Sequence, residues 1–202
     1  MGEPRFQRRK EDRPQEITEA AFEVFAEKGY AKARVQEVAT RAGVSKGLLY
    51  LYFETKQALF KAVIRSVVIR RMDALLAAVE ETELSSEAFI RGPLVAFMKA
   101  LPGSPVAVVI RLLISEGDRH PDLVDYYWEN VVSKGLQAMS ALLEQGVRNG
   151  EFRETAVTGL PQLIVAPALV SLLWRILFAS RDLDSDQLIE TQIDMLLAYI
   201  KA

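Results

Sequence analysis

The chain has 202 residues, of which 50% are apolar and 8% aromatic, so it can bury a core in one or two globular domains; disordered, collagen-like and disulfide-stapled classes are excluded. Because it has no cysteine and a single histidine, His120, it lacks the usual zinc ligands and catalytic nucleophiles, and we predict neither a metal nor a cofactor. The net charge of -2 by itself indicates no strong attraction to nucleic acid or anionic lipid.

That net charge combines two oppositely charged parts. Residues 1–71 contain 15 Lys and Arg against 9 Asp and Glu, whereas residues 72–202 contain 10 against 18. The basic part is therefore the candidate for contact with phosphate, and the acidic part needs another role. No apolar targeting segment follows the charged N-terminus, and the apolar stretch 163–174 is too short to span a membrane, so we expect a cytoplasmic protein.

The first 13 residues carry a basic cluster, made of Arg5, Arg8, Arg9, Lys10 and Arg13. We expect a disordered, solvated arm here. The alternative is an arm that reaches phosphate or a minor groove of DNA.

Apolar residues at helical spacing then begin, and they predict three short helices. The first starts at Pro14 and ends at Gly29, which suits a left-handed cap. The second covers residues 35–42, Gly43 breaks it, and Ser45 caps a third helix from residue 46 to about 53. Three short helices with a glycine turn between the last two are typical of a helix-turn-helix.

A long helix is predicted from Thr55 to about Glu81, basic in its first half and acidic at its end. Five further helices are predicted at residues 87–101, 105–119, 121–149, 155–179 and 186–200, the last capped by Ser185. No stretch alternates with a period of two, so we predict an all-α fold.

The outward face of the third helix is unusual for a surface helix. With Leu49 and Phe53 turned to the core, the outward arc holds residues 47, 48, 50 and 51, which are Gly, Leu, Tyr and Leu. Such a face suits the major groove of DNA, where thymine methyls accept apolar contacts and phosphates accept Lys, Ser and Tyr hydroxyl groups. The alternative is that Tyr50, Leu51 and Tyr52 pack against the long helix and that the lysines are solvated.

The dipeptide Gly29-Tyr30 and the run VQEVATRAGVSKGLLYLYFETKQALF over residues 35–60 resemble the DNA-binding domain of TetR/AcrR-family transcriptional regulators. The resemblance implies an N-terminal helix-turn-helix at 14–56, after the arm at 1–13. It also implies a larger all-α domain at 57–202 with a ligand cavity and a homodimer built on the last two helices. Such proteins usually repress, and a small molecule releases them from DNA.

The family's DNA-contact positions, carried over by this resemblance, fall on Arg34, Ser45, Lys46, Gly47, Leu48, Tyr50, Leu51, Tyr52 and Lys56. This chain differs from the family pattern at three of its positions. Ala33-Arg34 stands where a Ser or Thr usually caps the second helix. Without a replacement for this cap, the helix loses ~1 kcal/mol of stability. Leu48 stands where a small or polar residue is common and Leu51 where His or Tyr is common, which affects the bases that are read.

Candidates for a ligand pocket in the acidic part are apolar, aromatic and polar side chains that lie on the later helices: Phe97, Met98, Arg111, Leu113, Glu116, Trp128, Met139 and Trp174. Core packing is the default for each apolar member. Arg111 and Glu116 are expected to form a buried pair, with polar anchors in a pocket as the alternative. His120 precedes Pro121 at a helix junction, where a structural role is favoured over a metal ligand.

The helix at 155–179 is apolar on all sides, and the last helix carries an apolar stripe. The candidate dimer-interface residues are Leu169, Leu172, Leu173, Ile176, Ile189, Ile193, Leu196 and Leu197. The sequence therefore predicts a homodimeric, ligand-responsive DNA-binding regulator, most simply a repressor of a near-palindromic operator, and not an enzyme. The alternatives are an all-α enzyme that uses His120 with Glu116 or Asp118, and a helical carrier or scaffold without DNA contact.

Overall fold

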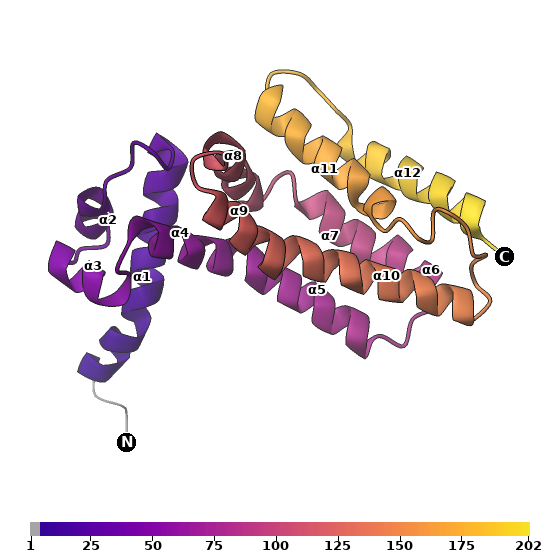
Figure 1. The fold of residues 1–202 in the computed structure, drawn as a ribbon, viewed down its shortest axis with the longest axis horizontal. Helices are drawn as coiled ribbons and strands as arrows, with labels where there is room; N and C mark the ends of the chain where they lie inside the picture. Colours follow the sequence, from indigo (N-terminus) through magenta and orange to yellow (C-terminus); the bar gives the residue numbers. More distant parts are fainter. Residues whose placement is uncertain (1–4) are drawn as a thin grey trace. The chain divides into compact units, whose positions relative to one another are not determined.

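The computed structural model describes the backbone of residues 5–202 and the side chains of residues 12–202. The described residues form helices and no strand, which confirms the all-α prediction; one isolated antiparallel bridge joins Phe152 and Lys201 (Figure 1). No described helix is both long enough and apolar enough to cross a membrane. The chain divides into two compact units. Unit 1 contains the residues up to Val68 together with Leu112–Tyr127, and unit 2 contains Ile69–Arg111 with Trp128–Ala202.

Unit 1 contains helices α1 (Arg5–Lys28), α2 (Val35–Arg41), α3 (Lys46–Tyr52), α4 (Lys56–Ile64) and α9 (Pro121–Tyr127), with the C-terminal end of α8 (Val106–Glu116). The sequence predicted the boundary between the two domains at residue 56. Unit 1 differs from that prediction because residues 112–127 pack with the N-terminal helices. The local signals for the first helices are confirmed. Gly29 and Gly43 adopt φ values of 77° and 64°, and the hydroxyls of Ser45 and Thr55 accept hydrogen bonds at the starts of α3 and α4.

Helix α1 begins earlier than predicted, at Arg5 instead of Pro14. Residues 5–13 are thus helical in the structure, where a disordered arm was expected, and residues 1–4 lie outside the described part of the chain. Pro14 is accommodated inside the helix although its ring nitrogen cannot donate a hydrogen bond.

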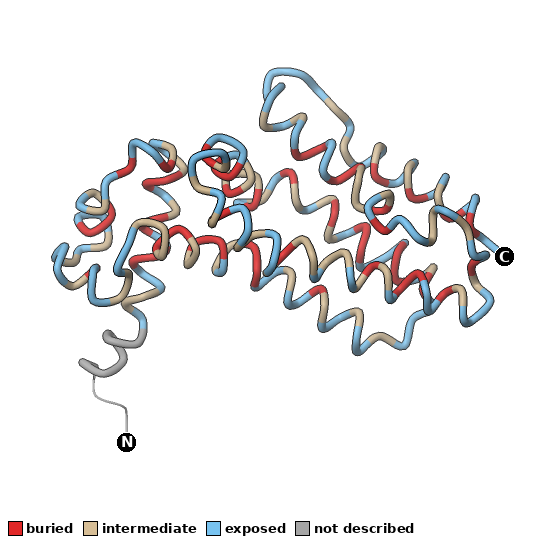
Figure 2. Tube along the Cα trace, viewed as in Figure 1, coloured by how far each residue is buried: buried red, intermediate tan, exposed pale blue. Residues whose placement is uncertain are grey.

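The core of unit 1 is built on a cluster of three aromatic rings. Phe25 lies edge-on to Phe60 with ring centroids 5.5 Å apart, and Tyr30 packs against both rings at 5.6 and 5.3 Å. All three side chains are almost fully buried, as are Ile17 and Ala21 of α1. Figure 2 marks the buried positions along the chain in red. Because these residues come from α1, α4 and the turn after α1, their burial fixes the support on which α2 and α3 rest.

Residues 56–81 are helical throughout, as predicted, but not uniformly so. A π-helical turn, η1 (Arg65–Ile69), separates α4 from α5 (Arg70–Glu81), and the boundary between the two units falls inside it. The sequence signals for helix ends did not predict this turn. Wider turns of this kind interrupt the regular hydrogen-bond ladder and are often found at functional positions.

Unit 2 contains α5 and the helices α6 (Ser86–Phe89), α7 (Val95–Ala100), α10 (Ser133–Arg148), α11 (Gln162–Leu177) and α12 (Ser185–Ile200), with π-helical turns η2 (Ile90–Leu94) and η3 (Trp128–Val132). Its core combines buried side chains of every one of these helices, among them Phe89, Met139 and Ile193. Pro93 lies in η2, where the missing N–H accounts for the departure from a regular α-helix.

Two predicted helix starts in unit 2 were wrong. Helix α11 begins at Gln162, not at Thr155, because Thr155 and Thr158 form a turn in which the backbone N–H of Thr155 donates to the Thr158 hydroxyl at 2.9 Å. Helix α12 is capped by Asp184 and not by Ser185, since the Asp184 carboxylate accepts from the backbone N–H of Gln187 at 2.9 Å.

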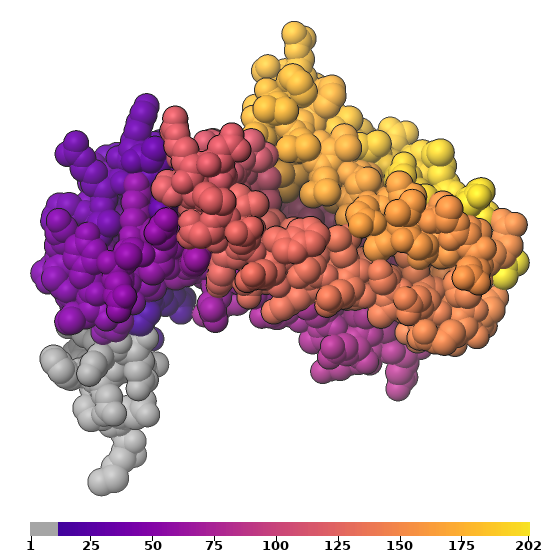
Figure 3. Space-filling view, viewed as in Figure 1, coloured from indigo at the N-terminus to yellow at the C-terminus, as the bar shows by residue number. Residues whose placement is uncertain are grey.

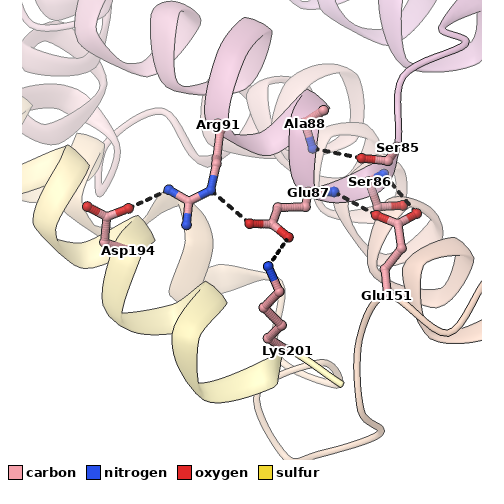
Figure 4. Close-up of polar contacts among 8 residues, drawn as sticks. All are labelled: Ser85, Ser86, Glu87, Ala88, Arg91, Glu151, Asp194 and Lys201. Carbon is pink, nitrogen blue, oxygen red and sulfur yellow. Dashed lines mark hydrogen bonds and ion pairs between the residues drawn. The ribbon is translucent and has the colours of Figure 1, made fainter.

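Polar contacts connect α6 to distant parts of unit 2 (Figure 4). The Glu151 carboxylate accepts from the backbone N–H groups of Ser86 and Glu87, at 3.2 and 3.0 Å, and so caps α6. Glu87 in turn pairs with Arg91 at 3.0 Å and with Lys201 at 3.2 Å, and Arg91 also pairs with Asp194 of α12. The end of the chain is thereby attached to α6 and η2.

Candidate nucleic-acid interface

Helix α3 lies on α2 through the tight turn at Gly43. The backbone N–H of Val44 donates to the carbonyl of Ala39 at 2.9 Å, and Val38 and Ala39 of α2 are buried. Leu49 of α3 is also buried, which confirms its predicted inward orientation, and Phe53 is half-buried. The opposite face of α3 is consequently turned to solvent.

The exposed face of α3 carries the predicted apolar and aromatic side chains. Leu51 is 81% exposed and Tyr50 is 40% exposed, while Leu48 and Tyr52 are half-buried. The alternative in which this face packs inside the chain is therefore wrong for Leu51 and partly right for Tyr52. The ammonium of Lys46 lies 5.8 Å from the centre of the Tyr50 ring, so a cation and an aromatic ring are neighbours on this face.

The start of α3 offers hydrogen-bonding groups without a bulky side chain. The Ser45 hydroxyl oxygen accepts from the backbone N–H of Leu48 at 3.1 Å, which leaves its O–H free to donate to a phosphate oxygen. Gly47 is exposed, and a Cβ at this position would have only the Ser45 hydroxyl as a neighbour, at 4.0 Å. The backbone can therefore approach a ligand closely at this point.

Arg34 precedes α2 and is exposed, as a phosphate contact requires. It provides no side-chain cap, but the Glu37 carboxylate accepts from the Arg34 backbone N–H at 3.1 Å and replaces part of the missing hydroxyl cap. Glu37 also pairs with Lys28 of α1 at 2.7 Å, and this hydrogen bond holds the pKa of Glu37 below its usual value. The stability that α2 was predicted to lose with its missing hydroxyl cap is therefore partly recovered through Glu37.

A bidentate ion pair attaches the end of α2 to α1. The Arg41 guanidinium donates to both carboxylate oxygens of Glu27, at 2.6 and 2.7 Å, and these hydrogen bonds lower the pKa of Glu27. The Arg41 side chain is thus engaged in an ion pair within unit 1, and this ion pair holds the end of α2 against α1.

Lys56 differs from the other predicted contacts because its ammonium is directed into unit 1. Its Nζ donates to the carbonyl of Ala31 at 3.2 Å and lies 4.5 Å from the centre of the Tyr30 ring. Burial lowers the pKa of Lys56. The structure therefore does not bring Lys56 together with Lys46 and Ser45 as an outward-directed cation.

Sequence reasoning missed a cluster of residues beside Lys56. The Glu116 carboxylate is 9% exposed and accepts from the backbone N–H of Ala31 at 3.3 Å through Oε1, whereas its Oε2 has no hydrogen-bond partner. The His120 ring packs edge-on against Tyr30 with centroids 5.0 Å apart, in line with its predicted structural role. Burial, with Asp122 and Glu116 nearby, raises the pKa of Tyr30 to about 12. No local motif marks this cluster, because its members are far apart in the sequence.

Helix α9 is held against α4 by a second set of unpredicted contacts. Asp122 accepts from the Gln57 amide at 3.3 Å and pairs with Lys61 at 3.3 Å. Arg65 donates to the Tyr126 hydroxyl at 3.3 Å, and the Lys61 ammonium lies 5.3 Å from the Tyr126 ring. Two of the basic residues of the long helix are therefore engaged with α9.

The basic arm is described only in part. Arg13 pairs with Glu16 at 2.9 Å, one turn along α1. The side chains of Arg5, Arg8, Arg9 and Lys10 lie outside the described residues, and their contact with DNA stays a prediction.

The pocket candidates are divided between the two units, since Leu113 and Glu116 belong to unit 1 and the others to unit 2. Arg111 is exposed while Glu116 is buried, so the expectation that both members of this pair are buried is wrong for Arg111. A pocket of about 240 Å³ in unit 2 is lined by Arg91, Val95, Glu190, Ile193 and Asp194, and none of these residues was a pocket candidate.

The candidates in unit 2 differ in their surroundings. Met98 and Met139 are buried in the core, and Phe97 packs against it, which is the default role given to them. Trp128 is exposed. Trp174 is half-buried, its ring meets the Phe178 ring edge-on with centroids 5.0 Å apart, and its indole N–H donates to the carbonyl of Arg181 at 3.0 Å.

The dimer-interface candidates are also divided. Leu172, Ile189, Ile193 and Leu197 are buried within unit 2 and cannot form an outer face, Ile176 and Leu196 are half-buried, and Leu169 and Leu173 are exposed. The stripe on α12 was wrongly interpreted because α11 itself covers much of it. The interface candidates did not include four exposed apolar side chains of these helices, Val170 and Leu177 on α11 and Met195 and Tyr199 on α12. Figure 3 shows the α11 and α12 segments, in orange to yellow, next to each other on one face.

These features define the class of the protein: a helix-turn-helix whose exposed third helix bears the apolar, hydroxyl and cationic groups that suit a DNA groove. Comparison with known families then identifies the chain. Residues 17–63 match the family described as bacterial regulatory proteins, tetR family, and residues 88–196 match the tetracyclin repressor-like C-terminal domain. The chain belongs to the TetR family and is a ligand-responsive, DNA-binding transcriptional regulator.

One sequence relative and two solved structures illustrate the relationship. The fatty acid metabolism regulator protein of Bacillus subtilis is 27% identical over 148 residues, which cover 72% of this chain and 74% of that protein. FadR of Bacillus subtilis, solved in complex with stearoyl-CoA, has a TM-score of 0.74 at 22% identity, over 92% of this chain and 98% of that one. SmeT of Stenotrophomonas maltophilia, solved with triclosan, has a TM-score of 0.79 at 19% identity, over 94% and 92%.

Proposed function

We propose that the protein is a homodimeric repressor that binds a near-palindromic operator and is released by a small-molecule effector. The observation that carries the DNA-binding part is the exposed face of α3, where Tyr50 and Leu51 are open to solvent beside Lys46 and the Ser45 hydroxyl. In this proposal Arg34, Ser45, Lys46 and Tyr52 contact the phosphate backbone, and Leu48, Tyr50 and Leu51, with the backbone at Gly47, meet the major groove. Lys56 supports the turn at Ala31 instead.

The dimer is supported by the outer face of unit 2. Leu169, Leu173 and Leu177 are exposed at intervals of four residues on α11, and Met195 and Tyr199 follow the same spacing on α12. Several large apolar residues on neighbouring helices are costly to leave in water, and a second copy of the same two helices would cover them as a four-helix interface. A two-fold dimer would present two α3 helices to successive major grooves, about 34 to 36 Å apart.

For the effector, the similar structure of FadR, which was solved in complex with stearoyl-CoA, supports a fatty acyl-CoA as the first compound to test. The acidic C-terminal part would bind this compound. The continuous helical segment 56–81 begins with α4 in unit 1 and ends with α5 in unit 2, so it would transmit the effect of ligand binding from α5 to α4. A protein with this role works in the cytoplasm, where it has access to DNA.

The test is a titration of the purified protein against DNA from upstream of its own gene at two salt concentrations. We expect specific binding with a steep salt dependence, and weaker binding in Tyr50→Ala and Lys46→Ala. Lys134→Ala, which removes an exposed lysine from α10, serves as the matched control and should bind as the wild type does. Absence of specific binding to every upstream fragment would contradict the proposal.

The effector is tested on the complex that this titration identifies. Stearoyl-CoA should dissociate the protein from the fragment, while free CoA at the same concentration should not. Transcription from the fragment in vitro should fall when the protein is added and recover with stearoyl-CoA. Increased transcription on adding the protein would identify an activator and refute repression.

A further inference from the structure

Helix α3 lacks the side chains that read bases through paired hydrogen bonds. Its seven residues, KGLLYLY over Lys46–Tyr52, include no Arg, Asn, Gln, Asp or Glu. Those are the residues that bind guanine, adenine and cytosine edges in the major groove with bidentate or direct hydrogen bonds. Apart from the cation of Lys46 and the phenols of its two tyrosines, α3 can discriminate between base pairs only through apolar contact.

Leu51 is the apolar side chain that is placed for such contact. At 81% exposure it is more open to solvent than any other large hydrophobic residue of the described chain. Its neighbours on the helix are less available, because Leu49 is buried and Leu48 is half-buried. The isobutyl group of Leu51 therefore extends outward from the surface that the proposed function places against DNA.

The major groove offers one apolar group, the C5 methyl of thymine, which cytosine lacks. A leucine side chain has no donor or acceptor, so it can respond to a base pair only by the presence or absence of that methyl group. Resting on the proposed function, we infer that Leu51 is a specificity-determining residue that recognises the C5 methyl group of a thymine in each operator half-site.

The surroundings of Leu51 favour a close approach to the base edge. Gly47, one turn earlier, has no side chain, and the space where its Cβ would lie is open. Ser45 and Lys46 stand at the start of the helix, where a hydroxyl and an ammonium can hold phosphate and fix the register of α3. The cationic and hydroxyl groups position the helix, and Leu51 reads the methyl group.

The test substitutes deoxyuridine for thymine, one position at a time in both half-sites, because this change removes the methyl group and nothing else. At one thymine position per half-site we expect binding to weaken about fourfold, the worth of one buried methyl-sized group, and thus about fifteenfold for both half-sites. At the same position, a 5-methylcytosine·G pair should bind better than an unmethylated C·G pair.

Variants of the protein test whether Leu51 is the residue that contacts the thymine methyl group. Leu51→Ala should weaken binding to the thymine operator and bind thymine and deoxyuridine operators equally. Tyr50→Phe, which keeps the neighbouring ring and removes only a hydroxyl, should still distinguish them. Because Leu51 is so exposed, its truncation should leave the thermal unfolding midpoint unchanged, which excludes a folding defect.

The two possible failures are distinguishable. If the wild-type protein binds no upstream fragment specifically, the proposed function fails. If it binds specifically but no deoxyuridine substitution alters its affinity, the inference about Leu51 is overturned. The same holds if Leu51→Ala weakens binding to both operators by the same factor, since the side chain would then lie against the sugar-phosphate backbone.

Discussion

The carboxylate of Glu116 accepts a hydrogen bond from the backbone N–H of Ala31, a residue 85 positions earlier in the chain, at 3.3 Å. The carbonyl of the same Ala31 accepts from Lys56 at 3.2 Å. One residue in the turn between α1 and α2 is thus held at its N–H by α8 and at its carbonyl by α4. Both contacts lie inside unit 1, and together they fix the turn that leads into the helix-turn-helix.

Replacement of Glu116 tests the first of these contacts. We expect Glu116→Ala to reduce the free energy of unfolding by about 1 to 3 kcal/mol, because the partly buried N–H of Ala31 loses its acceptor. Glu116→Gln keeps a carbonyl oxygen at that place and should stay within about 1 kcal/mol of the wild type. Urea unfolding measures both. An unchanged unfolding midpoint in Glu116→Ala would show that the contact does not stabilise the fold.

Lys56 and Lys46 should behave differently in DNA binding, because only Lys46 is directed outward. Lys46→Met should lower the slope of log affinity against log salt by about 0.9 for each phosphate that the protein no longer neutralises. Lys56→Met should leave that slope unchanged and instead lower stability, since it removes the hydrogen bond to Ala31 and the charge beside Tyr30. A reduced slope in Lys56→Met would show that Lys56 binds phosphate after all.

The raised pKa of Tyr30 predicts a loss of stability at alkaline pH. Burial, with the charges of Asp122 and Glu116, raises its pKa to about 12, whereas the pKa of tyrosine in an unfolded chain is about 10. Between these values the unfolded chain releases a proton that the folded chain keeps. The free energy of unfolding therefore falls as the pH rises through this window, by up to about 1.4 kcal/mol per pH unit.

Tyr30→Phe should remove this contribution and flatten the pH dependence between about pH 10 and pH 12. Burial raises the pKa of Tyr127 to about 12 as well, so the double variant with Tyr127→Phe should be flatter still. Unfolding in urea at a series of alkaline pH values measures the slope. Identical slopes in wild type and Tyr30→Phe would contradict the assigned cause.

Two glycines of α10 form a matched pair for a packing prediction. A Cβ on Gly146 would overlap the buried ring of Phe152, so Gly146→Ala should destabilise the protein by about 1 to 3 kcal/mol. A Cβ on Gly135 would meet only the flexible end of Met72, at 3.4 Å, and Gly135→Ala should gain up to about 1 kcal/mol of helix propensity. Thermal unfolding compares them, and equal shifts would refute the packing argument.

The proposed dimer depends on the exposed face of α11. Leu169→Lys combined with Leu173→Lys should produce a monomer in sedimentation experiments and greatly weaken operator binding, because charges would be buried in the interface. Leu160→Lys also changes an exposed leucine, but outside α11 and α12, and should leave the dimer intact. A double variant that still sediments as a dimer would exclude this face as the interface.

Much of the secondary structure could be predicted because its signals are local. Gly29, Gly43, Ser45 and Thr55 each act within one helical turn, through a positive φ or a hydroxyl cap, and all four behave as predicted. Where local signals compete, the prediction failed. Thr155 resembles a helix start but forms a turn with Thr158, and α1 continues through Pro14 in spite of its missing N–H.

Periodicity and capping, which depend on near neighbours in the chain, were enough to predict the all-α class, the helix-turn-helix and the outward apolar face of α3. The order of charged residues likewise separated a basic first third from an acidic remainder. Long-range packing was needed to show that Ile189 and Ile193 belong to the core and not to an outer face, and that Lys56 turns inward to Ala31. An apolar stripe along a helix shows that this face of the helix must be buried. Which element buries it depends on how distant segments of the chain pack together.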